Sequence, residues 1–336
     1  MAFDLRGLLA ERGGEGYELW NKYLNLQQVK ALHVIGFDKV YTRAEGAYLY
    51  DADDNRYTDF LAGFGVFAAG RNHPVIRQAI KDAVDLELAE WTQFDCPPLP
   101  GLLAEKLLAK TPGLDRVFFC NSGTEAVESA LKFARYATGK RRVLYCDHGF
   151  HGLTTGSLAV NGSAEFRRGF DPLLPDTPIP LGDIDALAAE LRRGDVAALI
   201  IEPVQGKGVH MPPDGFLAAA SALLHEHGAV LICDEVQTGF GRTGRFFAYQ
   251  YEDVTPDIVT VAKALSGGFV PVGAMLAKGW IYEKVYSSMD RFMVHSTTFK
   301  GGTLAMAAGL ASLDVIETEG LVENAQRVGG LLSDGL

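Results

Sequence analysis

Apolar positions in the middle of the chain form short continuous runs that alternate with stretches of helical period. The runs have the length and composition of strands buried on both faces, and they occupy residues 117–120, 143–146, 196–201, 229–233 and 258–261. The amphipathic stretches beside them predict helices at residues 102–108, 125–138, 184–193 and 215–227. This alternation indicates an α/β fold with a mostly parallel sheet flanked by helices.

Both ends of the chain depart from this pattern. Residues 46–60 alternate apolar and polar positions around Asp53-Asp54-Asn55, which predicts a β-hairpin. Residues 303–336 have a helical period that is broken near Glu319-Gly320. A length of 336 residues with 48% hydrophobic content is enough for a sizeable core and suggests two domains.

Charge and hydropathy exclude several kinds of partner. The net charge of −11 disfavours binding to DNA or RNA. No apolar run approaches the ~20 residues that a membrane span needs, and the first residues carry charges without the apolar segment of a secretion signal. The four cysteines lie far apart and are interpreted as reduced thiols: Cys96, Cys120, Cys146 and Cys233. We therefore expect a cytoplasmic protein without a metal site.

Residues just beyond the predicted strands are the place to look for chemistry, because open α/β sheets bind ligands at the carboxyl ends of their strands. Ser122, Gly123 and Thr124 stand between a predicted strand and a predicted helix. Small residues at a helix N-terminus leave backbone N–H groups free for an anion such as phosphate. The alternative is an ordinary capping box formed by Ser122 and Glu125.

Asp234 and Lys263 follow two further apolar runs. A carboxylate at such a place can hold a metal in a nucleotide hydrolase, but the G-x-x-x-x-G-K-[ST] loop that this requires is absent. The carboxylate can instead keep a heterocyclic nitrogen protonated, or simply cap the next turn. A poorly solvated lysine is easily made neutral and nucleophilic. The alternative for Lys263 is a side chain that extends from the strand end to solvent.

Residues 239–244 match G-x-G-x-x-G, the pattern of a dinucleotide site. No helical pattern follows, and the position twenty residues beyond Gly244 is Ala264, where a dinucleotide site would have an acid. We reject that interpretation. A phosphate site, a carboxylate and a lysine at the strand ends of one sheet instead match the three attachment points of pyridoxal phosphate.

The chain resembles the class III aminotransferases, which belong to the fold-type-I pyridoxal-phosphate superfamily. The matching stretches are residues 121–131, 148–152, 201–206, 234–244, 261–268 and 295–299. The resemblance implies a large cofactor-binding domain at residues 66–302. It also implies an N-terminal segment of the small domain at 1–65 and the start of a C-terminal domain at 303–336.

The resemblance assigns roles to individual residues. It implies that Lys263 forms the Schiff base with pyridoxal 5′-phosphate and that Asp234 contacts its pyridine nitrogen. The remaining cofactor contacts that it implies are Ser122, Gly123 and Thr124 at the phosphate, Gln237 at the phenolic oxygen, Phe150 on the pyridine face with His151 beside it, Glu202 in the wall of the site, and Thr298 reaching the phosphate of a neighbouring subunit. A homodimer with shared active sites follows, while Phe150 as a plain core aromatic remains the alternative for that residue.

The resemblance also suggests substrates. The 234–244 motif is similar to the acetylornithine, ornithine and diamine branch, and residues 61–67 and 295–299 most resemble putrescine aminotransferases. We expect transfer of a terminal amino group to a 2-oxo acid, with 2-oxoglutarate favoured. The alternatives are a glutamate-semialdehyde-type aminomutase and a non-catalytic, truncated remnant.

Three departures from the family pattern bear on this expectation. Lys207 occupies the position of a glutamate that pairs with a substrate-gating arginine, so it either binds a substrate carboxylate or faces solvent. Residues 300–303 read Lys-Gly-Gly-Thr where the family has Gly-Gly-Asn-Pro. The family also continues past Leu336 into a C-terminal domain, which predicts that this chain is a fragment or a truncated product.

Overall fold

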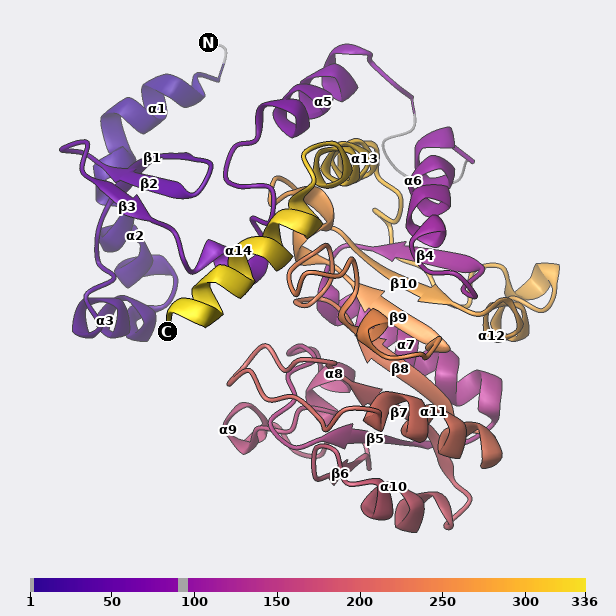
Figure 1. Cartoon of the computed structure of the whole chain (residues 1–336). Helices are drawn as coiled ribbons and strands as arrows, with labels where there is room; N and C mark the ends of the chain where they lie inside the picture. The colour runs from indigo at the N-terminus through magenta and orange to yellow at the C-terminus, as the bar shows by residue number, and fades with distance from the viewer. Residues whose placement is uncertain (1–2, 90–95) are drawn as a thin grey trace. The chain divides into compact units, whose positions relative to one another are not determined.

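The structure is a computed structural model that describes residues 3–89 and 96–336 (Figure 1). The chain divides into two compact units, Met1–Phe60 and Leu61–Leu336. The second unit contains the whole seven-stranded sheet and all the residues that the sequence marks as candidates for chemistry. Among the described residues, no helix has both the length and the apolar character needed to cross a membrane.

The first unit combines short helices with a small antiparallel sheet. Its elements are α1 (Leu5–Arg12), η1 (Gly13–Glu15), α2 (Gly16–Tyr23), α3 (Leu26–Val34), β1 (Tyr41–Glu45), β2 (Tyr48–Asp51) and β3 (Arg56–Thr58). The side chain of Asp51 tightens the turn between β2 and β3, because its Oδ1 accepts hydrogen bonds from the backbone N–H groups of Asp53 and Asn55. The hairpin predicted at residues 46–60 is therefore confirmed. Strand β1 was not predicted.

The sheet of the second unit has the order β4-β10-β9-β8-β7-β5-β6, which Figure 1 shows as one continuous layer. Its strands are β4 (Arg116–Cys120), β5 (Arg142–Cys146), β6 (Thr177–Ile179), β7 (Val196–Ile201), β8 (Val230–Asp234), β9 (Ile258–Val261) and β10 (Gly273–Ala277). All five predicted strands are present. Strands β6 and β10 were not predicted, and β10 is antiparallel to both of its neighbours.

Helices connect these strands and cover the sheet. They are α4 (Ala62–Gly65), α5 (Pro74–Asp85), α6 (Pro98–Ala109), α7 (Gly123–Thr138), α8 (Thr155–Ala159), α9 (Ala164–Arg167), α10 (Ile184–Leu191), α11 (Phe216–Glu226), η2 (Ala248–Tyr251), η3 (Lys263–Ser266), α12 (Gly279–Val285), η4 (Met289–Arg291), α13 (Thr303–Thr318) and α14 (Leu321–Gly335). Gly139 ends α7 with a φ of 70°, and Gly320 separates α13 from α14 with a φ of 59°. Both breaks agree with the sequence predictions, since glycine adopts positive φ without a steric penalty.

Two apolar cores lie on opposite faces of the sheet. Neighbouring residues of one strand divide between them: Phe118 and Tyr145 pack in the core that contains α7 and α12, whereas Phe119 and Leu144 pack in the core that contains α6, α10, α11 and α13. Successive side chains of a strand point to opposite faces, so continuous apolar runs are needed when both faces are covered. The predicted α/β architecture, with helices on both sides, is confirmed.

Residues 303–336 form part of the second unit. Met306, Leu313 and Ile316 of α13 belong to the larger core. The hydroxyl of Ser312 donates a hydrogen bond of 2.9 Å to the backbone carbonyl of Ala264, the residue after Lys263. Helix α13 therefore supports the short turn that carries the candidate lysine.

Candidate active site

Asp234 is held from three sides at the end of β8. Its Oδ1 accepts hydrogen bonds from the backbone N–H of Val236 at 3.1 Å and from the hydroxyl of Thr260 at 3.0 Å. Its Oδ2 lies 2.7 Å from Nδ1 of His151. Asp234 is the last residue of β8, whereas the sequence pattern placed it directly after the strand. These contacts fix a buried carboxylate at the carboxyl edge of the sheet.

His151 keeps a positive charge available beside that carboxylate. Burial alone would lower the pKa of His151, but the hydrogen bond to Asp234 and the charges of Asp234 and Glu202 raise it above its ordinary value. The backbone N–H of His151 donates to Oδ1 of Asn161 at 2.6 Å, which fixes the turn. Its Nε2 is buried and has no hydrogen-bond partner among the described residues.

Glu202, directly after β7, orders the backbone of the same region. Its Oε2 accepts a hydrogen bond from the N–H of Phe150 at 2.8 Å, and its Oε1 accepts one from Gly206 at 3.0 Å. Burial raises the pKa of Glu202, and the nearby charge of Asp234 acts in the same direction. The ring of Phe150 is half-buried and meets Phe166 edge-on, with 5.2 Å between centroids.

Lys263 begins η3 in an unusual backbone conformation. Its φ is +46°, which costs free energy for a residue with a side chain and is found most often at functional sites. Burial lowers the pKa of Lys263; Asp234 and Glu202 oppose that shift, while Arg242 adds to it. The amine is therefore easier to deprotonate than that of an exposed lysine.

The N-terminus of α7 adjoins both of these groups. A Cβ placed on Gly123 would lie 2.9 Å from Cγ1 of Val236 and 3.4 Å from Cβ of Ala262. Those two residues are close neighbours of Asp234 and Lys263 in the chain, so the helix end, the acid and the lysine meet at one place. The absence of a side chain at position 123 lets Val236 and Ala262 pack closely against the start of the helix, whose first N–H groups have no intrahelical acceptor.

The hydroxyls beside this helix end are already engaged. Oγ of Ser122 accepts a hydrogen bond from the N–H of Glu125 at 3.3 Å, which is one half of the predicted capping box, whereas the Glu125 carboxylate accepts from the N–H of Asn121 at 2.6 Å. Oγ1 of Thr124 lies 2.6 Å from Oγ of Ser157 and 2.8 Å from Oγ1 of Thr154. Cap and anion site are thus compatible, because backbone N–H groups remain available for the anion.

Gln237 and Thr298 occupy different surroundings. Nε2 of Gln237 donates to the backbone carbonyl of Phe64 at 2.9 Å, so this side chain fixes the segment around α4. Thr298 is exposed, while the preceding Thr297 accepts a hydrogen bond of 2.8 Å from Nδ2 of Asn121. The structure therefore places Thr298 at the surface, on a loop fastened next to Ser122.

The structure also reveals contacts that the sequence analysis missed. Lys207 is exposed, in agreement with the solvent-facing alternative, and does not contact Asp234 or Lys263; its Nζ forms a surface ion pair with Glu165 and lies over the ring of Phe166 at 5.0 Å. Thr260 is the one polar residue in β9, and that polar interruption was the available signal for its bond to Asp234. Arg242, within the rejected dinucleotide motif, was not considered for the site at all.

A parallel α/β sheet with a lysine, a carboxylate and an open helix N-terminus at its carboxyl edge defines a pyridoxal-phosphate enzyme of fold type I. The chain belongs to the aminotransferase class-III family, whose model matches residues 33–336. Its cofactor is pyridoxal 5′-phosphate, and its reaction class is transamination.

Two curated relatives illustrate the similarity. The aminotransferase PigE of Serratia sp. is 40% identical over 321 residues, which cover 94% of this chain but 38% of that protein. The acetylornithine aminotransferase of Methanopyrus kandleri is 44% identical over 295 residues, covering 85% of this chain and 72% of that protein. The chain therefore spans well under half of the first relative and about three quarters of the second.

Solved structures give the same family. An ornithine aminotransferase from Toxoplasma gondii matches with a TM-score of 0.82 at 30% identity, covering 96% of this chain and 78% of that one. An amine transaminase from an uncultivated Pseudomonas species, solved with pyridoxal phosphate bound, matches with a TM-score of 0.79 at 33% identity over 88% of this chain and 74% of that one. Both similarities cover most of this chain.

Proposed function

We propose that this chain carries the active site of a transaminase that takes a terminal amino group from a diamine or ornithine-like donor and gives it to a 2-oxo acid. The observation that carries the proposal is the meeting of the α7 N-terminus with Asp234 and Lys263 around Gly123. The named relatives act on ornithine, acetylornithine or an amine, which supports a donor that reacts through an amino group.

The residues of the site fit pyridoxal phosphate. Ser122, Gly123 and Thr124 would hold the phosphate through backbone N–H groups at the positive end of α7. Asp234 would bind the pyridine nitrogen, and its contact of 2.7 Å with His151 holds the carboxylate in position for that purpose. When bound, the cofactor supplies an electron sink for the negative charge that develops on the substrate carbon.

Four more residues complete the proposed contacts. Phe150 would lie across the pyridine face and Gln237 would approach the phenolic oxygen, while Glu202 holds the Phe150 backbone through a hydrogen bond. Thr298 would reach the phosphate bound by a second copy of the chain. Exposed Met289, Phe292 and Phe299 around that loop support a homodimer with shared active sites.

Lys263 has two successive tasks in this proposal. Its Nζ would hold the cofactor covalently, and the lowered pKa that burial gives it favours the neutral, nucleophilic amine. With substrate bound, the free Nζ would remove the proton from the substrate carbon that carries the amino group.

Substrate and location are proposed from weaker signals. The similarity of residues 61–67 and 295–299 to putrescine aminotransferases favours putrescine-like donors and 2-oxoglutarate as acceptor. Cys120, Cys146 and Cys233 are buried free thiols, which supports a reducing, cytoplasmic location.

A donor panel tests the proposal directly. The cofactor-loaded chain is assayed with putrescine, ornithine, acetylornithine and several α-amino acids, with 2-oxoglutarate as acceptor. We expect turnover with the terminal amines, and we expect Lys263→Ala to lose both turnover and the yellow absorbance that borohydride bleaches. Reaction with α-amino acids alone would refute the donor class, and a colourless protein in excess cofactor would favour the non-catalytic alternative.

A further inference from the structure

The loop at residues 295–299, between η4 and α13, is fastened to α7 and to the residues just before it. At one point, Nδ2 of Asn121 donates a hydrogen bond of 2.8 Å to Oγ1 of Thr297. At another, Nε2 of His295 lies 2.8 Å from Oγ of Ser129, a buried residue in the second turn of the helix. The loop therefore runs alongside the start of α7, where the proposed phosphate site lies.

Two independent contacts require the same protonation state of His295. The hydroxyl of Ser129 donates its single hydrogen to the backbone carbonyl of Glu125 at 2.7 Å, so its oxygen can only accept from Nε2 of the histidine. Nζ of Lys132 lies 2.8 Å from Nδ1 of His295, and an ammonium group can only donate. Nε2 therefore carries the hydrogen and Nδ1 carries none, which is a neutral imidazole.

The ring of His295 also packs against the apolar core. Its centroid lies 4.6 Å from that of Phe118 and 5.5 Å from that of Phe133, and both phenylalanines belong to the core that contains α7 and α12. The hydroxyl of Tyr286 donates a hydrogen bond of 2.7 Å to the backbone carbonyl of His295. This residue thus joins the loop to the body of the domain through its ring and its backbone.

A proton on His295 would oppose these contacts. Burial lowers the pKa of His295 to about 4. The charges of Lys132 and Lys300 act in the same direction, whereas that of Glu128 opposes them. A charged ring would also place an N–H opposite the ammonium of Lys132. Docking of the loop is therefore strongest above the ordinary histidine pKa of about 6.5 and weakens as pH falls toward 4.

We propose that His295 is a positioning residue whose neutral ring holds the 295–299 loop beside the start of α7, and that protonation of the ring releases this loop. In its effect on cofactor affinity the inference rests on the proposed transaminase function, because Thr298 lies on the same loop. His295 would then act on the phosphate contact without touching the cofactor. Acid would weaken that contact by moving the loop and not by altering Asp234 or Lys263.

A thiol placed in the loop measures its release in the full chain. Oγ of Ser296 is buried and has no hydrogen-bond partner among the described residues, so Ser296→Cys breaks none of the hydrogen bonds described above. The introduced thiol is trapped with 4,4′-dithiodipyridine, and its rate is divided by that of the exposed Cys96 thiol in the same molecule. We expect this ratio to rise about 10–30-fold between pH 7.5 and pH 5, from the two pKa values of about 6.5 and 4.

Three variants in this background separate the titration of His295 from other effects of acid. His295→Gln keeps an N–H for Ser129 but cannot take up a proton at these pH values, so the ratio should not rise. Lys132→Gln removes one cause of the low pKa, and the rise should be smaller. His210→Gln removes an exposed histidine and should follow the parent chain. No rise in the parent chain, or an equal rise in His295→Gln, overturns the role of His295.

Cofactor binding provides a second readout. The Kd values of pyridoxal phosphate and of pyridoxal, which lacks the phosphate, are measured by absorbance at pH 7.5. In His295→Ala we expect about tenfold weaker binding of pyridoxal phosphate and little change for pyridoxal, with His295→Gln in between. Equal losses for the two ligands overturn the effect on the phosphate contact.

The two proposals can fail separately. A chain that turns over amines but shows pH-independent trapping overturns the role of His295 and leaves transamination intact. A chain that binds neither pyridoxal phosphate nor pyridoxal, yet shows the expected trapping in the parent and in His295→Gln, overturns transamination and leaves the role of His295 in holding the loop.

Discussion

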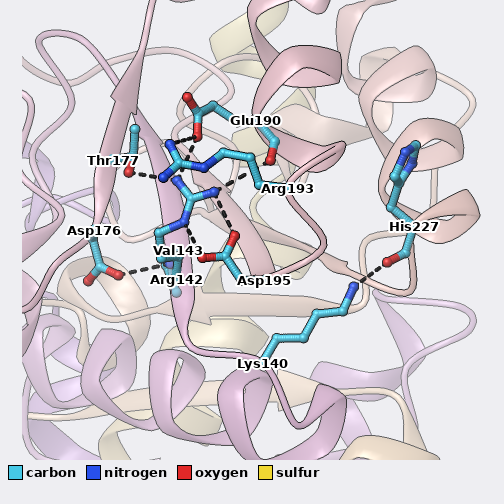
Figure 2. A network of polar contacts seen from close by, with 9 residues as sticks. All are labelled: Lys140, Arg142, Val143, Asp176, Thr177, Glu190, Arg193, Asp195 and His227. Atoms are coloured by element: carbon cyan, nitrogen blue, oxygen red, sulfur yellow. Dashed lines mark hydrogen bonds and ion pairs between the residues drawn. The ribbon is translucent and has the colours of Figure 1, made fainter.

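Charged side chains at the amino ends of the strands of the seven-stranded sheet and those at the carboxyl ends differ in the partners that surround them. At the amino edge, where β5, β6 and β7 begin, Arg142 donates to Asp195 at 2.7 and 2.8 Å and to Glu190 at 2.6 Å (Figure 2). Thr177 accepts a further bond at 2.9 Å. These hydrogen bonds and charges, that with Asp195 above all, raise the pKa of Arg142. Every nitrogen of this guanidinium has an acceptor.

At the carboxyl ends, Arg242 is an exposed residue without such a set of acceptors in the part of the chain that the structure describes, and partial desolvation lowers its pKa. Lys263 is shifted in the same direction. The pKa values of two arginines in one domain are thus shifted in opposite directions, because Arg142 has acidic partners and Arg242 has none among the described residues. The difference indicates that the amino edge contributes stability, whereas the carboxyl edge keeps cations available for ligands at the expense of stability.

The same substitution at the two ends gives the largest contrast. Asp234→Asn removes both the charge proposed for the pyridine nitrogen and one partner of the buried pair with His151, so we expect kcat to fall about 10³-fold together with a loss of stability. Asp257→Asn weakens the buried acid at the start of β9 that binds Lys278 and His225, each at 2.8 Å. That variant should unfold more easily yet keep its activity per folded molecule. Steady-state kinetics and urea denaturation of both variants test this contrast. Equal losses of kcat would contradict the assignment of catalysis to the carboxyl ends of the strands and of stability to the amino ends.

Arg142→Ala should have the next largest effect. Loss of the guanidinium leaves Asp195 without its partner and Glu190 with Arg193 alone, and we expect the free energy of unfolding to drop by about 3 kcal/mol. Arg193→Ala is the control, since Arg193 shares Glu190 at 3.2 Å but is mostly exposed (Figure 2). The control should change stability by less than about 1 kcal/mol. Denaturant midpoints compare the two, and similar losses would show that the network is not cooperative.

The smallest expected effect concerns pH. Burial raises the pKa of Glu235 to about 7, although it accepts hydrogen bonds from Thr238 and Tyr249. The folded state therefore favours the protonated acid, so its contribution to stability is full below the ordinary glutamate pKa and is lost as pH rises through about 7. Between pH values of about 5 and 8 this group should lower the free energy of unfolding by about 2 kcal/mol.

Glu235→Gln isolates that effect, because the amide oxygen can still accept from the N–H of Tyr249. Denaturation at several pH values should give a flatter stability profile for the variant than for the parent chain. If the two profiles run parallel, Glu235 is not the group responsible.

The sequence was sufficient to predict most strands of the sheet but not the position of β10 within it. Continuous apolar runs predicted β4, β5, β7, β8 and β9, because a strand buried on both faces must be apolar throughout. The segment of β10 is apolar too, but its antiparallel insertion between β4 and β9 depends on pairing across more than 150 positions of the chain. No local pattern encodes such a pairing.

The residues of the site could likewise be predicted where the signal was local in the sequence, but not where it depended on contacts between distant residues. Asp234 and Lys263 could be found because they follow strands, and Gly123 because small residues opened a helix. The bond between His151 and Asp234 and the ion pair of Lys207 with Glu165 join residues far apart in sequence. The unmatched charge of Arg242 is likewise a property of its surroundings in space, since nothing in the residues 239–244 distinguishes it from Arg245.

Strand β4 lies at an edge of the described sheet and is hydrogen-bonded to β10 alone, whose Gly273 sits directly against the carbonyl of Ser122. A ribosome releases residues 116–124 long before residues 273–277, and domains fold as their elements become available. The nascent chain must therefore carry an unfinished phosphate cradle while about 150 further residues are synthesised. On this account the chain can bind its cofactor only after β10 has been synthesised and has paired with β4.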